Sequence, residues 1–144
     1  MMALKQLLPP RDICAITCYG VIYSYDNMGN LLSLSREGDM TSSLKGIVDN
    51  LSMTYDGNRL ASVSDSAPAP SVTGSADFRD GASMAVEYTY DRNGNMTSDL
   101  NRRISSVSYN RQNRPARMRH AGGTETFTYL PDGTKRGRTF LGKG

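Results

Sequence analysis

Apolar and polar residues alternate in five short segments of the chain, and each of these segments ends at a tyrosine. A Ser or Thr lies directly before each tyrosine and an apolar residue lies two positions before it, as in Tyr23-Ser24-Tyr25. Successive side chains of a β-strand point to opposite faces, so the tyrosine and the apolar residue share one face and the hydroxyl residue takes the other. We call these five the repeat tyrosines: Tyr25, Tyr55, Tyr90, Tyr109 and Tyr129.

Turn-forming residues follow the repeat tyrosines. Gly adopts positive φ without strain, and Asp and Asn side chains bond the nearby backbone, so these residues together favour a tight reversal. The pattern predicts five β-hairpins, with return strands at 31–35, 59–64, 95–99, 114–119 and 134–140. The residues assigned to this repeat framework are Tyr23, Tyr25, Asp26, Gly29, Tyr55, Asp56, Gly57, Tyr88, Tyr90, Asp91, Gly94, Tyr109, Phe127, Tyr129 and Gly133.

The repeats extend over most of the chain and predict an all-β fold. We expect residues 21–140 to form one domain of repeated antiparallel β-hairpins in a single curved open sheet, after an N-terminal segment, 1–20, of uncertain structure. Long intervals between the first three repeat tyrosines predict loop insertions at 36–50 and 67–83, the second of which is alternatively a domain boundary. A lone hairpin is only marginally stable, so the repeat tyrosines are expected to pack between neighbouring hairpins.

Charge is distributed unevenly along the 144 residues. Residues 1–100 hold 7 Lys or Arg against 12 Asp or Glu, whereas residues 101–144 hold 10 against 2. These basic residues are spread over several turns, which favours the wet face of a small sheet over a dense cationic block. Contact with a glycan or another polyanion is the alternative, and specific nucleic-acid binding is not expected. The candidate ligand-contacting residues are Arg117, Arg119, Lys135 and Arg136.

Few residues suggest catalysis or metal binding. The only histidine, His120, is distant in sequence from the two cysteines, Cys14 and Cys18, so no zinc-type spacing is present. The segment from Asp91 resembles the start of a calcium loop, but its fourth residue is the glycine and Arg102 stands twelfth, where an EF-hand needs glycine sixth and glutamate twelfth. We therefore expect a turn rather than a cation site, no cofactor and no enzymatic activity.

No targeting or membrane segment is evident. A membrane-spanning helix needs about 18 or more consecutive apolar residues, and no such stretch occurs, so no span is expected. Near the N-terminus, residues 9–12 (PPRD) interrupt the apolar core that a signal peptide requires, so this segment does not predict export.

Three longer segments carry a resemblance to a known family. The sequences YSYDNMGNLLSLSREG, MTYDGNRLASVSD and VEYTYDRNGNMTSDLNRRISSVSYNRQNRP resemble the YD repeats of the RHS family, in the form common in gut Bacteroidetes. The resemblance covers residues 21–136 and implies hairpins that stack into a spiralling β-shell, which encloses or presents toxin and effector domains. It also implies a secreted or cell-surface location. Five hairpins are too few to close a shell, so we expect a partial shell from a fragment or short member.

Three functions are compatible with these features. The first is a non-catalytic structural or scaffold segment of an RHS-repeat protein. The second is a cell-surface carbohydrate or polyanion binding module that uses exposed tyrosines and the basic C-terminal part. The third is an accessory whose hairpins extend the sheet of a longer relative. Unpaired strand edges also predict self-association or pairing with other RHS-repeat segments.

Overall fold

The computed structural model describes residues 20–72 and 77–143, so the N-terminal segment expected at 1–20 lies almost wholly outside the described residues. Within them the chain forms β-strands and no helix, which confirms the all-β prediction. The strands are β1 (Val21–Tyr25), β2 (Leu31–Asp39), β3 (Lys45–Asp56), β4 (Arg59–Asp65), β5 (Tyr88–Tyr90), β6 (Met96–Asp99), β7 (Ile104–Tyr109), β8 (Pro115–His120), β9 (Gly123–Tyr129) and β10 (Lys135–Gly142).

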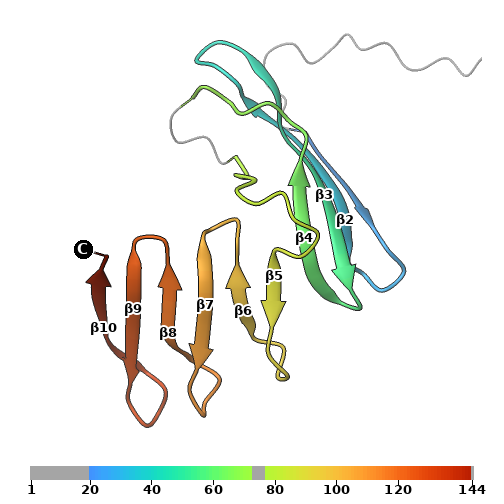
Figure 1. Ribbon diagram of the computed structural model, residues 1–144. Helices are drawn as coiled ribbons and strands as arrows, with labels where there is room; N and C mark the ends of the chain where they lie inside the picture. The colour runs from blue at the N-terminus through green and yellow to red at the C-terminus, as the bar shows by residue number, and fades with distance from the viewer. Residues whose placement is uncertain (1–19, 73–76, 144) are drawn as a thin grey trace, which may run out of the picture.

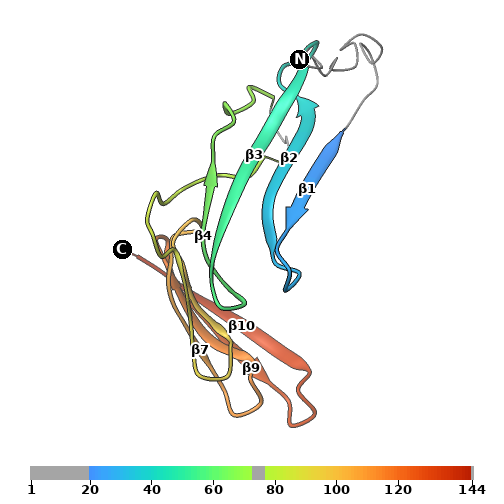
Figure 2. The ribbon, with the colours of Figure 1, turned by 90° about the vertical axis from the view of Figure 1, so that its right-hand side faces the viewer.

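The strands form two antiparallel sheets rather than the single sheet expected. Sheet A has the order β1-β2-β3-β4 and sheet B the order β10-β9-β8-β7-β6-β5, so every strand lies beside its neighbour in sequence. Figure 1 shows that the two sheets meet at their edge strands, with β4 next to β5. Neither sheet closes on itself, and Figure 2 shows the same two sheets from a second side. The prediction of repeated hairpins in an open arrangement is confirmed. The prediction of one continuous sheet is wrong, because the strand ladder is interrupted between β4 and β5.

The first insertion, predicted as a loop at 36–50, is mostly strand. β2 continues to Asp39 and β3 begins at Lys45, and a short turn joins them through a hydrogen bond from the Met40 amide to the Leu44 carbonyl at 2.8 Å. Gly38 permits this extension, because a Cβ there would lie only 3.1 Å from the methyl groups of Val48. The second insertion, 67–83, contains no strand in its described residues, as predicted.

The apolar core is small. Its buried hydrophobic residues are Val48, Leu51, Val63 and Val107. Four repeat tyrosines are half-buried and the fifth, Tyr25, is 59% exposed. Because these single-layer sheets bury little apolar surface, hydrogen bonds between hairpins gain importance for stability.

Glu87 joins the two sheets and is 2% exposed. Its amide donates to the Ala61 carbonyl of β4 at 2.7 Å, and its carbonyl accepts from the Leu100 amide, just after β6, at 3.0 Å. Its carboxylate accepts from the Val63 amide at 3.0 Å and from Asn101 Nδ2 at 2.7 Å. A side-chain oxygen thus takes the place of a strand carbonyl where β4 and β5 diverge.

Glu87→Ala is expected to lower the free energy of unfolding by about 1–3 kcal/mol, because the amide of buried Val63 loses its acceptor. Glu87→Gln should cost less, since the amide oxygen can still accept one bond. The control is Glu37→Ala, at an exposed position on β2, with an expected change within about 0.5 kcal/mol. Urea melts measure these differences, and equal costs for the two alanine variants would contradict the joining role of Glu87.

Candidate functional site

The first turn shows how the repeat motif reverses the chain. Oδ1 of Asp26 accepts from the amides of Met28 and Asn30 at 2.8 Å each, and Oδ2 accepts from Asn30 Nδ2 at 2.7 Å. Gly29 has a φ of 85°, which glycine adopts without strain. The Asp carboxylate is therefore a part of its own turn.

The same turn recurs in the third and fourth hairpins. Asp91 Oδ1 accepts from the amides of Asn93 and Asn95 at 2.9 Å each, so the segment from Asp91 is a turn, as predicted. In the fourth hairpin Asn110 replaces the aspartate and accepts from the amides two and four residues further on, at 2.9 and 3.0 Å. Asn113 takes the glycine position with a φ of 55°. An amide oxygen can therefore replace the carboxylate in this turn.

Turn hydrogen bonds lower the pKa of exposed carboxyl groups. For Asp26 and Asp91 the side-chain bonds from Asn30 and Asn95 are the largest cause, and backbone amides lower the pKa further. The backbone amide of Thr134 is the main cause for Asp132, which also has a pKa below its usual value. These groups stay ionised to lower pH than ordinary aspartates.

Four repeat tyrosines bond the hairpin that precedes them. Each hydroxyl donates to a main-chain carbonyl at the start of the preceding return strand. The pairs are Tyr55 with Leu31 at 2.8 Å, Tyr90 with Leu60 at 3.1 Å, Tyr109 with Met96 at 2.7 Å and Tyr129 with Pro115 at 2.8 Å. We call these the inter-hairpin tyrosine bonds. They connect all five hairpins in series, including the two hairpins on either side of the break between the sheets.

The rings that make these bonds are packed against neighbouring residues. Desolvation raises the pKa of Tyr90 and of Tyr109 above the usual value of a phenol. Arg59, from the preceding hairpin, holds its guanidinium 5.9 Å from the Tyr90 ring centroid and opposes that rise in pKa. Arg114 lies in the same way 5.8 Å from the ring of Tyr129. Such cation–π contacts add to the packing between hairpins.

Side chains of one turn are also hydrogen bonded to the side chains or main chain of the next turn. These bonds run from Asn30 Nδ2 to Asn58 Oδ1 at 3.3 Å, from Asn93 Nδ2 and Asn95 Nδ2 to Asn113 Oδ1 at 3.2 Å each, and from Gln112 Nε2 to the Pro131 carbonyl at 2.8 Å. They align the turns at one end of each sheet.

Tyr25 is the repeat tyrosine at the outer edge of sheet A. It lies on β1 and is 59% exposed, and Tyr23 beside it is 51% exposed. The two rings stack with their centroids 6.3 Å apart. Within residues 20–72 and 77–143 the Tyr25 hydroxyl has no hydrogen-bond acceptor. This pair is therefore an exposed aromatic surface of the kind that the alternative binding function requires.

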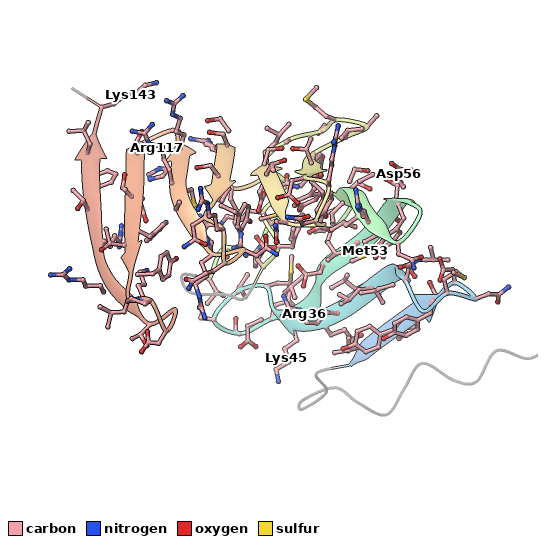
Figure 3. All side chains as sticks on the ribbon, turned by 90° about the horizontal axis from the view of Figure 1, so that it is seen from below. Arg36, Lys45, Met53, Asp56, Arg117 and Lys143 are labelled. Atoms are coloured by element: carbon pink, nitrogen blue, oxygen red, sulfur yellow. The ribbon has the colours of Figure 1, made fainter. Side chains whose placement is uncertain are left out.

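The four candidate basic residues do not share one patch. Arg117 and Arg119 are exposed on β8, on the face of sheet B that carries the Ser and Thr side chains. The side chain of Arg117 is labelled in Figure 3. Lys135 Nζ lies 4.3 Å from the ring centroid of Phe127, on the opposite face. Arg136 is exposed at the bulge in β10. All four belong to sheet B, whereas the exposed tyrosine pair belongs to sheet A.

An acidic cluster is present that spacing in the sequence does not suggest. The carboxylates of Asp49, Asp65 and Asp77, from β3, β4 and the second insertion, lie within 4.8 Å of one another. Asp49 forms an ion pair with Arg36 and accepts from the Phe78 amide at 2.7 Å. Burial and the two neighbouring carboxylates raise the pKa of Asp77. The bond between the Phe78 amide and Asp49 thus attaches this part of the insertion to β3.

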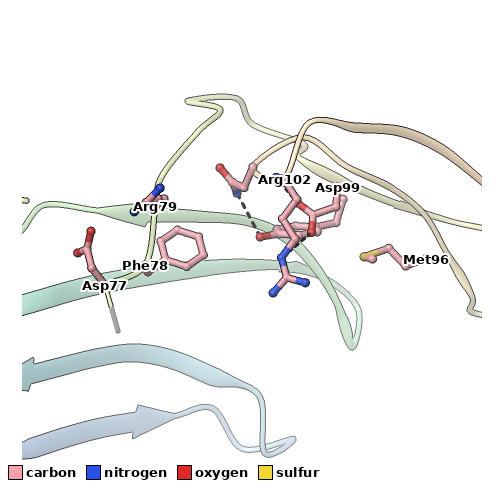
Figure 4. Close-up of a pocket in the computed structure, with 8 residues that line it drawn as sticks. Asp77, Phe78, Arg79, Met96, Asp99 and Arg102 are labelled. Carbon is pink, nitrogen blue, oxygen red and sulfur yellow. Dashed lines mark hydrogen bonds and ion pairs between the residues drawn. The ribbon is translucent and has the colours of Figure 1, made fainter. Parts of the chain in front are cut away.

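A cleft of about 540 Å³ lies between residues 77–79 and sheet B (Figure 4). Asn101 Nδ2 donates to the Tyr88 hydroxyl at 3.1 Å, and Arg102 Nε lies 3.7 Å from Asp99 Oδ2. Burial of the ring raises the pKa of Tyr88. Several polar groups that line the cleft are therefore paired with one another.

Comparisons with protein-family models, curated proteins and solved structures give no match to this chain. Over the described residues, no helix is long and apolar enough to cross a membrane.

Tyr109→Phe is expected to lower the free energy of unfolding by about 0.5–1.5 kcal/mol, because it removes one hydrogen bond and leaves the ring in place. Tyr25→Phe is the matched control and should leave the stability of dilute protein within about 0.5 kcal/mol, since its hydroxyl is exposed. Urea melts decide between them. A loss in Tyr25→Phe as large as that in Tyr109→Phe would show that the hydroxyl bond is not what stabilises the hairpins.

Acid is expected to destabilise the turns. The folded-state pKa values of Asp26, Asp91 and Asp132 lie below the usual 3.8, so their contribution is complete above that value and is lost as the pH falls through the folded-state values. Asp77, whose pKa is raised, acts in the opposite direction.

Asp91→Asn should keep the turn, because Asn110 closes the same turn in the fourth hairpin, and should weaken the acid dependence. Urea melts between pH 5 and pH 2 test this expectation. An unchanged acid dependence in Asp91→Asn, with the stability at pH 7 preserved, would contradict it.

Proposed function

We propose that this chain is a non-catalytic scaffold segment built of hairpin repeats, similar to a part of the β-shell that in the RHS family encloses or presents toxin and effector domains. The observation that carries the proposal is the series of inter-hairpin tyrosine bonds. Four of the five tyrosines that define the repeat use their hydroxyl group to hold the preceding hairpin. The repeated motif therefore joins each hairpin to the one before it.

The turns support the same interpretation. Asp26 and Asp91 have their carboxylate oxygens occupied by backbone amides and asparagine side chains of their own turns. Groups held in this way are poorly placed for general acid–base catalysis, which needs a carboxyl group free to exchange a proton with a substrate. Four of the repeat tyrosines and these two aspartates therefore have structural partners.

The open ends of the sheets suit a segment of a larger shell. Within each sheet, a hairpin adds its first strand antiparallel to the return strand of the hairpin before it, as β3 does to β2 and β9 to β8. In such an array the stability depends on contacts between nearest neighbours, so length can vary without a change of design. A shell wall is a function that this arrangement can provide.

A carbohydrate-binding module remains the second candidate because Tyr23 and Tyr25 are both exposed and stacked. Exposed aromatic rings can pack against sugar rings. The basic residues of sheet B would contact an anionic glycan only at a distance from this pair, because the two groups lie on different sheets.

Binding measurements separate the two functions. On a panel of neutral and acidic glycans in about 150 mM salt, the scaffold proposal predicts no saturable binding, and weak attraction to polyanions that fades as salt rises. Saturable, salt-resistant binding would overturn the proposal if Tyr23→Ala abolished it and the control Tyr109→Phe kept it. Charge reversal at Arg117 and Arg119 tests the polyanion alternative in the same assay.

A further inference from the structure

Four strands form the edges of the two sheets within the described residues. β4 and β5 lie next to each other and are linked through Glu87, whereas the outer edges of β1 and β10 have no strand beside them (Figure 1). We propose that a second copy of this chain adds its β1 to the β10 of the first, so that the protein associates head to tail. This inference extends the proposed scaffold function from the construction of one chain to the assembly of several.

The repeat supplies a register for this junction. Where the first hairpin meets the second, Ser33 of β2 pairs with Ser52 of β3, and where the fourth meets the fifth, Arg117 of β8 pairs with Thr126 of β9. In both cases the first residue lies eight positions after the repeat tyrosine of its hairpin, and the second lies three positions before the repeat tyrosine of the next hairpin. If the same spacing holds between two copies, Gly137 of the first copy, eight positions after Tyr129, pairs with Ile22 of the second copy, three positions before Tyr25. Arg138 then lies opposite Val21.

The backbone groups at both edges suit this register. The Glu37 amide donates to the Gly20 carbonyl at 2.9 Å, so Gly20 is directed at β2 and the next residue, Val21, presents its amide and carbonyl to the outer side. At the other edge the Lys143 amide donates to the Gly122 carbonyl at 3.1 Å. The same alternation along β10 directs the amide and carbonyl of Arg138 outward. Val21 and Arg138 would therefore exchange both of their hydrogen bonds.

The inter-hairpin tyrosine bond would also be completed. Tyr109 donates to Met96 and Tyr129 to Pro115, and in both cases the acceptor follows the preceding repeat tyrosine by the same number of residues. Counted from Tyr129, that position is Lys135. Tyr25 of the second copy, whose hydroxyl has no acceptor within residues 20–72 and 77–143, would donate to the Lys135 carbonyl of the first.

The net charges of the two sheets favour pairing of β1 with β10 over pairing of two identical edges. Residues 21–65, which form sheet A, hold three Lys or Arg against six Asp or Glu, a net charge of −3. Residues 88–142, which form sheet B, hold ten against four, a net charge of +6 with His120 neutral. Pairing β1 with β10 brings opposite charges together, whereas β1 with β1 or β10 with β10 opposes like charges. A head-to-tail contact of this kind generates open chains, or rings if the rotation closes.

The β1 edge also exposes apolar side chains that pairing would cover. Val21 is 40% and Ile22 74% exposed, and in this register they lie opposite Arg138 and Gly137. Long strands with unpaired backbone groups and exposed apolar residues template further strand addition.

Proline substitutions block each edge separately. Val21→Pro and Arg138→Pro each remove one outward amide, and proline is tolerated on edge strands. Val21→Ala and Arg138→Ala are the matched controls, because they remove the same side chain, including the Arg138 ion pair with Glu125, and keep the amide. Circular dichroism confirms that each variant is folded, and sedimentation velocity over a concentration series measures association.

The full chain is expected to form oligomers that grow with concentration, and each alanine control should do the same. Each proline variant alone should stay monomeric, yet an equimolar mixture of the two should form a dimer and nothing larger, because one free edge of each kind remains. Two outcomes overturn the inference: a wild-type protein that is monomeric throughout, or a single proline variant that dimerises by itself. Neither outcome touches the glycan-binding test of the scaffold function.

Tyrosine variants test the register independently. Tyr25→Phe should weaken the association roughly two- to tenfold, as expected for the loss of one hydrogen bond. Tyr23→Phe is the control, since Val107 and Phe127, which have no hydroxyl group, occupy the corresponding position in other hairpins. Equal dissociation constants for the two variants would contradict a register in which Tyr25 bonds the Lys135 carbonyl.

Discussion

A hydrogen bond from a tyrosine hydroxyl to a main-chain carbonyl of the preceding hairpin is the interaction on which the rest of this structure depends. A hairpin alone buries too little surface to be stable, and only four hydrophobic residues are buried in the described part of the chain. The tyrosine addresses this weakness in two ways, because its ring covers apolar surface while its hydroxyl fixes the position of the neighbour. Strand pairing orients each hairpin, and the tyrosine bond fixes the position of that hairpin relative to the one before it.

A bulge in the strand beside the repeat tyrosine allows this bond to form in successive hairpins. The strand register shifts between Ser24 and Tyr25 and again between Thr89 and Tyr90, so a bulge accompanies the repeat tyrosine. Bulges redirect the side chain beside them and increase the local twist. A bulge at this point, followed by a tight turn, lets the ring reach the corresponding carbonyl in hairpins of different length. The break between the sheets shows how robust the scheme is, because Tyr90 still bonds Leu60 where the strand ladder has stopped.

Much of the fold could be predicted from the sequence, since strand alternation and turn chemistry are local. The faces of the strands and the positions of the turns follow from the placement of Ser, Thr, Asp and Gly. The strands in the first insertion were missed because the loop was predicted from the long interval between Tyr25 and Tyr55. Gly38, whose lack of a side chain makes room for Val48, lets β2 continue through it. The two-sheet division depends on Glu87, whose partners come from both sheets and leave no local signal.

The candidate site was predictable only in part for a similar reason. The tyrosines stand out in the sequence, but their acceptors are main-chain carbonyls, which any residue provides. The acidic cluster joins Asp49, Asp65 and Asp77 from three separate segments, and no spacing rule connects them. The four basic residues are close in sequence but divide between two faces, because Lys135 reaches over Phe127 while Arg117 points to the hydroxyl face.

Amide hydrogen exchange in Tyr129→Phe, followed residue by residue by NMR, tests most directly the claim that each tyrosine holds its hairpin to the one before. The lost bond joins β9 to Pro115 at the start of β8. The account predicts faster exchange confined to β9 and β10, with protection in β1–β4 unchanged, because coupling acts between nearest neighbours. Unchanged exchange in β9 and β10, or an equal loss of protection in every strand, would contradict it.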